Sequence, residues 1–143
     1  MTAPSHSPSP FSALGGIPGV TSACVLKLPS VPGPVGLEEL YSFGKAFDDG
    51  REEAVSFGIT SIRDKCNGAI SPHAPSLTVS GSPYQLVQST DRSVILVGRN
   101  RSCLLLHFAT TWGLCVAVRS EFPALPNVVA VDLLRVLNWL KIS

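Results

Sequence analysis

The sequence predicts an α+β fold in which a central antiparallel sheet carries a long helix on one face. From Ser76 to Arg101, runs of alternating apolar and polar residues are separated by turn residues. This pattern is typical of an antiparallel meander with one covered face. Over residues 48–67, apolar residues instead recur at intervals of three and four, which indicates one face of an amphipathic helix.

The helix over 48–67 has a defined start and a defined stop. Asp48 or Asp49 can cap the first free amides, and acidic residues in the first turn complement the helix dipole. Asn67-Gly68 is a typical helix end. We expect the apolar face to contact the sheet through Val55, Ile59, Ile62 and Cys66.

Further strands are expected on both sides of the meander. Residues Val20 to Leu28 and Leu37 to Phe43 are strand candidates, separated by a loop rich in proline and glycine over 29–36. Residues 103–118 are nearly uncharged, and Trp112-Gly113 can divide them into strands Cys103–Ala109 and Leu114–Val118. A transmembrane helix is the competing interpretation, although this window is shorter than the usual span of about 20 residues.

A final helix follows the breakers Pro123 and Pro126, with Asn127 as its cap. We expect Asp132 and Arg135 to lie opposite the apolar residues that line much of this helix, which are Val128, Val131, Leu134 and Trp139.

The composition favours a protein that works through its surface. The chain has 143 residues, enough for one core, with 45% hydrophobic and only 15% charged residues. So few charges cover a small domain poorly, which suggests that apolar surface faces a partner. The net charge of +1 argues against nucleic acid, which requires a basic face.

No pattern of catalytic or metal-binding residues stands out. The four cysteines form no C-x-x-C pair and lie in apolar contexts, so we expect reduced core thiols. No serine occupies a G-x-S-x-G elbow, and the acidic residues near 48–53 are more typical of a helix start than of a divalent-ion site. The sequence therefore predicts no catalytic residue, no cofactor and no metal.

The candidate partner interface consists of Phe57, Arg92, Arg99 and Arg101. Phe57 points away from the apolar face of the predicted helix. The three arginines are expected to cluster near the last turn of the meander. They suit either a solvated sheet edge that discourages aggregation or a patch that binds acidic groups of a partner.

Three segments carry a resemblance to a known family. They are L-G-G-I-P-G-V-T-S-A-C-V-L (Leu14–Leu26), L-Y-S-F-G-K-A-F-D-D-G-R-E-E-A (Leu40–Ala54) and the meander from S-L-T-V-S-G to I-L-V-G-R-N-R. Together they resemble the roadblock dynein light-chain family, a branch of the profilin-like αβ sandwiches. The meander is most similar to the small roadblock-fold subunit of the Ragulator complex.

This resemblance implies a non-enzymatic scaffold subunit. It implies a heterodimer with another roadblock-fold subunit, a place on the lysosomal or late endosomal surface held by another subunit, and indirect support of Rag GTPases in target-of-rapamycin signalling. The alternative is a profilin-like protein that binds actin or another cytoskeletal protein, because Tyr84 to Val118 and the final helix look like the second half of profilin. In both cases we expect no membrane span.

The resemblance also implies a division of the chain. Residues 1–13 are a disordered Ser/Pro-rich tail, and residues 14–101 are the roadblock-like domain. Residues 102–143 are an apolar extension, a variant C-terminus, or the last strands and helix of a fuller profilin-like domain.

Overall fold

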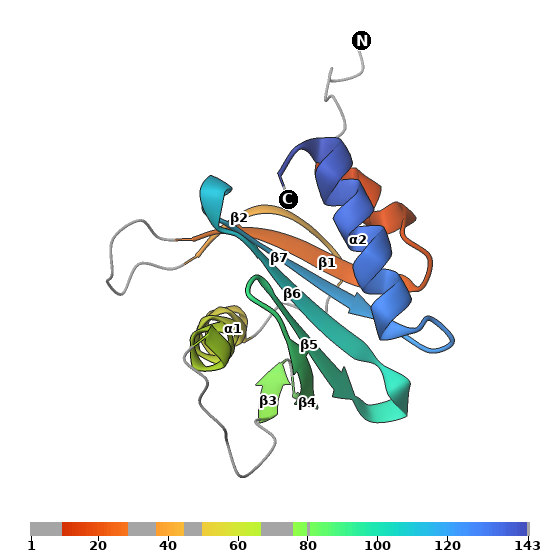
Figure 1. Cartoon of the computed structure of the whole chain (residues 1–143). Coiled ribbons are helices and arrows are strands. Elements are labelled where there is room, and N and C mark those ends of the chain that lie inside the picture. Colours follow the sequence, from red (N-terminus) through yellow and green to blue (C-terminus); the bar gives the residue numbers. More distant parts are fainter. Residues whose placement is uncertain (1–9, 29–36, 45–49, 67–75, 80, 143) are drawn as a thin grey trace.

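A single antiparallel sheet organises the protein (Figure 1). The computed structural model describes residues 10–28, 37–44, 50–66, 76–79 and 81–142. The strand order is β2-β1-β7-β6-β5-β4-β3, and each neighbouring pair is antiparallel. The strands are β1 (Val20–Lys27), β2 (Glu38–Phe43), β3 (Ser76–Val79), β4 (Ser82–Ser89), β5 (Ser93–Gly98), β6 (Cys103–Ala109) and β7 (Leu114–Ser120).

The helices cover both faces of this sheet. The three that do so are η1 (Pro10–Gly16), α1 (Arg51–Cys66) and α2 (Pro126–Leu140), whereas η2 (Arg99–Arg101) and η3 (Thr110–Trp112) are single turns that connect strands. Helices η1 and α2 pack on one face, and α1 packs on the other. The predicted α+β class is thereby confirmed, with a helical layer on each side of the antiparallel sheet.

The central strands β6 and β7 are buried on both faces. Leu105 and Val116 point into the core beneath α2, whereas Leu104, Leu106 and Cys115 point into the core beneath α1. Burial on two faces explains the near-continuous apolar run, which folds as two strands rather than as a transmembrane helix. Among the described residues, no helix is long and apolar enough to span a membrane.

The boundaries expected at 13 and 101 do not coincide with a break in the fold. Pro10 to Gly16 form η1, which contacts β1, β2 and α2 and buries Leu14. Residues after 101 supply β6, β7 and α2, so they lie in the middle of the sheet and over one face. Residues 102–143 therefore belong to the same sheet and to one of its helical layers.

Helix α1 contacts the sheet through a face rotated from the predicted one. Ala54, Val55 and Gly58 are buried, and Ile62 packs against the same core. Ile59 is 43% exposed, so its predicted contact with the sheet is wrong. The reason is that a glycine at position 58 lets the helix backbone approach the sheet closely. The predicted caps at 48–49 and the stop at 67–68 lie outside the described residues.

Helix α2 also differs from its predicted orientation. Val129, Leu133 and Leu137 are its buried residues, and Leu125, rather than Asn127, is the residue before its first turn. The predicted apolar line is exposed to solvent, and it comprises Val128, Val131, Leu134 and Trp139. Asp132 and Arg135 line the same depression as Val128 and Val131, so their predicted place opposite this line is wrong.

Candidate protein-interaction site

Exposed apolar side chains are concentrated near and along α2. Ten large apolar side chains are exposed in the described part of the chain, and six of them lie between residues 122 and 139. Such clustering distinguishes an interaction surface from scattered surface apolar residues, which are normal in soluble proteins. The α2 patch is defined here as Phe122, Leu125, Val128, Val131 and Leu134.

The helical repeat generates this patch. Val129, Leu133 and Leu137 are four residues apart and face the core, so the stripe containing Val128 and Val131 faces outward. On the outward surface there is an open depression, which is lined by Asn127, Val128, Val131, Asp132 and Arg135. The C-terminal helix therefore presents a hollowed apolar surface bordered by polar side chains.

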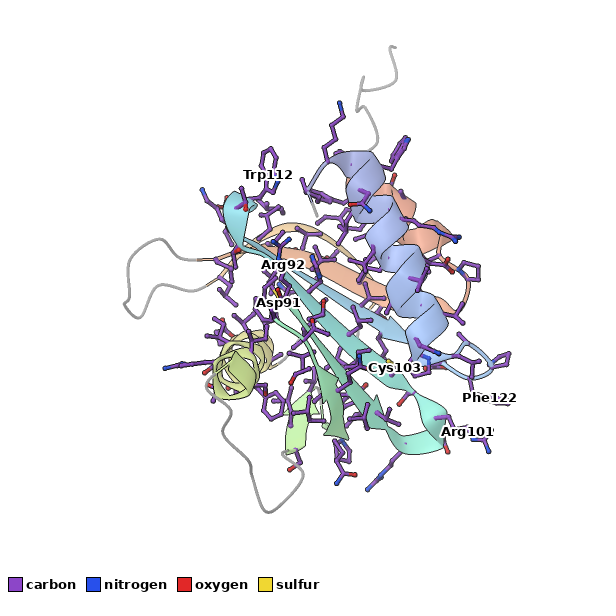
Figure 2. The ribbon with its side chains drawn as sticks, viewed as in Figure 1. Asp91, Arg92, Arg101, Cys103, Trp112 and Phe122 are labelled. Atoms are coloured by element: carbon purple, nitrogen blue, oxygen red, sulfur yellow. The ribbon has the colours of Figure 1, made fainter. Side chains whose placement is uncertain are left out.

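The turn between β5 and β6 lies at one end of this patch. Asn100 and Arg101 both have positive φ, at 57° and 58°. The backbone amide of Ser102 donates to the carbonyl of Arg99 at 3.0 Å, and its hydroxyl donates to the same carbonyl at 2.8 Å. The turn directs the Arg101 guanidinium over the Phe122 ring, 5.0 Å from the ring centroid (Figure 2).

The charges around the patch are unbalanced. Arg135 pairs with Asp132 at 3.7 Å, and Arg119 pairs with Glu121 at 3.3 Å. By contrast, neither Arg99 nor Arg101 forms an ion pair with another residue in the described ranges. The two nearby acids are thus already matched to arginines, and the β5–β6 turn leaves an excess of positive charge.

The structure separates the residues predicted for the interface. Arg99 and Arg101 share the β5–β6 turn, but Arg92 lies in the β4–β5 turn at the opposite end of β5 (Figure 2). Six residues of strand separate the two turns, a length of about 20 Å. The expected cluster of three arginines is therefore wrong. Phe57 is partly buried and packs against the core beneath α1, so it is not the exposed interface residue that was predicted.

Sequence reasoning missed the apolar members of the site. It placed Val128 and Val131 on an apolar line of the final helix without assigning them to an interface, and it gave no role to Phe122 or Leu125. One signal was present, because α2 carries a second apolar stripe with a spacing of four at 129, 133 and 137. Two apolar stripes on one helix indicate that one of them is available to a partner.

His107 and Ser93 form a buried polar contact between β5 and β6 that resembles part of a catalytic dyad. Its Nδ1 lies 2.8 Å from the Ser93 hydroxyl oxygen, while its Nε2 is buried without a partner among the described residues. Burial lowers the pKa of His107, and the positive charge of Arg92 lowers it further. The side chain is only 3% exposed, so a substrate cannot reach this base. In the described part of the chain, no three His, Cys, Asp or Glu side chains gather as a metal site.

No family model and no curated protein sequence matches this chain. Solved structures that share its fold include two profilins from complexes with actin. LokiProfilin2, in its complex with rabbit actin, has a TM-score of 0.63 and 11% identity, with 92% of each chain covered. LokiProfilin1, also in complex with rabbit actin, has a TM-score of 0.56 and 12% identity, covering 92% of this chain and 90% of that one.

The chain therefore has a profilin-like fold. The broader part of the sequence resemblance, to profilin-like αβ sandwiches, is confirmed by these two structures. The narrower part, to the roadblock family and its Ragulator subunit, stays a prediction.

Proposed function

We propose that this protein is a profilin-like actin or cytoskeletal binding protein that engages its partner through the α2 patch. The observation that carries the proposal is the fold shared across nearly the whole chain with two proteins in complexes with actin. The α2 patch supports it independently, because it supplies an exposed apolar surface of the kind that protein interfaces bury.

The α2 patch is a better candidate than the outer face of α1. In the described residues, α1 exposes one large apolar side chain, Ile59, whereas the segment from 122 to 139 exposes six. The roadblock resemblance implies a heterodimer that pairs through the outer face of α1 and an edge strand of the sheet. Within the part of the chain that the structure describes, the outer face of α1 carries no such concentration of apolar side chains. The exposed apolar surface therefore does not favour the scaffold role with Rag GTPases at the lysosomal surface.

The test is binding of the purified full chain to monomeric actin. Complex formation is measured by size-exclusion chromatography with light scattering and by the effect on actin polymerisation. Val131→Asp places a carboxylate in the middle of the α2 patch, where desolvation without a partner is unfavourable. We expect at least a tenfold loss of affinity, with an unchanged melting temperature because Val131 is already exposed.

Ile59→Asp is the matched variant on the other face of the sheet. It should leave actin binding unchanged, and its melting temperature should report that the fold is intact. Absence of a complex between the wild-type chain and actin would rule out the proposed partner. If Ile59→Asp abolished actin binding and Val131→Asp did not, the interface would lie on α1, the helix that the roadblock interpretation also uses.

A further inference from the structure

Arg101 occupies a backbone conformation that favours glycine. Asn100 and Arg101 are consecutive residues with positive φ in a tight turn between two antiparallel strands. Turns with two such residues strongly prefer Asn followed by Gly, because a Cβ crowds the backbone at the second position. Asparagine is present at the first position, but an arginine stands where glycine would be least strained.

The side chain of Arg101 indicates what offsets this strain. Its guanidinium stacks over Phe122, a residue that is itself 56% exposed. Stacking on an aromatic face restricts the long side chain while leaving its N–H donors free at the edge of the planar group. No carboxylate in the described ranges accepts these donors. The result is a preorganised cation at the rim of an apolar surface.

We propose that Arg101, assisted by Arg99, binds a carboxylate on a protein partner that also presents apolar side chains to the α2 patch. This inference rests on the proposed function in using the same surface, but it does not require the partner to be actin. The charge complementarity is local: Asp132 and Glu121 are paired with Arg135 and Arg119, so the turn retains the unmatched positive charge. A bidentate arginine–carboxylate contact beside an apolar centre fixes the register of an interface.

The apolar neighbours favour a protein over other anionic partners. Leu125, Val128 and Val131 are exposed apolar members of the α2 patch, and a polyanion such as nucleic acid offers nothing to cover them. The whole chain carries a net charge of only +1, which gives little attraction to a nucleic acid or an anionic membrane. A mixed acidic and apolar surface matches both parts of the site.

The experiment compares two short peptides that differ only in charge. One contains leucine and glutamate, and the other contains leucine and glutamine in the same order. Each is titrated into the isotopically labelled full chain while backbone amide shifts are recorded. We expect the glutamate peptide to shift the amides of residues 99–102 and of the α2 patch. We expect the glutamine peptide to bind at least tenfold more weakly.

Three variants separate recognition from folding. Arg101→Gly removes the cation and relieves the backbone, so we expect an unchanged or higher melting temperature and at least a tenfold weaker response to the glutamate peptide. A lower melting temperature with unchanged peptide binding would mean that Arg101 only stabilises the fold. Arg101→Lys should recover part of the binding. Arg92→Gln removes an exposed cation at the other end of β5 and should bind the peptide as the wild type does.

Several results would overturn the inference. They are equal binding of the two peptides, shifts confined to other elements, or a loss with Arg92→Gln as large as with Arg101→Gly. Attachment to phosphatidylserine vesicles that depends on Arg101, without any preference for the glutamate peptide, would also overturn it in favour of a lipid. A chain that prefers the glutamate peptide but ignores actin would refute the proposed partner and retain this inference. If the Arg101→Gly variant bound actin as well as the wild type and the glutamate peptide bound no better than the glutamine peptide, the actin proposal would stand and this inference would be refuted.

Discussion

Gly58 on α1 lies directly against the ring of Phe108 on β6. A Cβ at Gly58 would lie 2.6 Å from Cζ and 2.7 Å from Cε2 of that ring, closer than real contacts allow. Phe108 is buried in the core beneath α1, so its ring has little room to move. This close approach sets the distance between α1 and the sheet.

Gly58→Ala should therefore destabilise the protein, although alanine is the better helix former by about 1 kcal/mol. Overpacking a filled core typically costs about 1–3 kcal/mol, and we expect a net loss in that direction. Chemical denaturation gives the free energy of unfolding. Thr60→Ala, at an exposed position of the same helix, is the control and should change stability little. A gain in stability for Gly58→Ala would show that the helix stands further from Phe108.

Leu133 and Leu134 provide a matched pair on α2. Leu133 is 1% exposed and Leu134 is 41% exposed, although the two are adjacent in the sequence. Truncation of a buried leucine to alanine costs about 2–5 kcal/mol, so Leu133→Ala should lower the denaturation midpoint strongly. Leu134→Ala should have a much smaller effect. Equal losses would contradict the observed orientation of the helix.

His107 should make stability depend on pH in the mildly acidic range. Its pKa in the folded chain is lowered from 6.5 by burial and by Arg92, while Asp91 acts in the opposite direction. The unfolded chain therefore binds a proton more readily, so stability is full above pH 6.5 and falls as the pH drops toward the folded pKa. His107→Gln should show a shallower loss of stability between neutral and mildly acidic pH. Identical slopes for both proteins would exclude His107 as the cause.

The buried cysteines should resist thiol reagents. Burial raises the pKa of Cys103 to about 11 and that of Cys24 to about 12, and it also raises the pKa of Cys115. Because the thiolate is the reactive form, these three should remain unlabelled at pH 8 in the folded protein and react after denaturation. Mass mapping of the labelled peptides identifies each site. Rapid labelling of Cys103 in the native protein would show that β6 opens locally.

Local sequence was sufficient to locate most of the elements. The predicted strand Cys103–Ala109 has the same bounds as β6, and the meander separates into β3, β4 and β5 as expected. Strand alternation and turn residues act over a few neighbouring positions, which is why the sequence alone carries this information. The charge-poor composition likewise indicated exposed apolar surface, which the structure shows along α2.

Part of the candidate site was also predictable. Arg99 and Arg101 are adjacent in the sequence to a turn that the pattern of residues locates, so both could be assigned to an exposed position. Phe122 could not be joined to them, because it follows β7 and meets Arg101 only when β6 and β7 pair. Arg92 precedes Arg99 by only seven residues in the sequence, yet strand β5 lies between them and carries Arg92 to its opposite end.

The amino-acid sequence by itself determined that this chain forms an antiparallel sheet with helices and that it lacks obvious catalytic motifs. Only the tertiary structure decided which stripe of each helix is buried. Both Ile59 and Val131 fit an apolar stripe, but Gly58 draws α1 toward Phe108, and Leu133 directs α2 onto the sheet. Helical spacing defines the available faces, whereas the shape of the opposing surface selects one of them, and the remaining apolar face of α2 is left exposed.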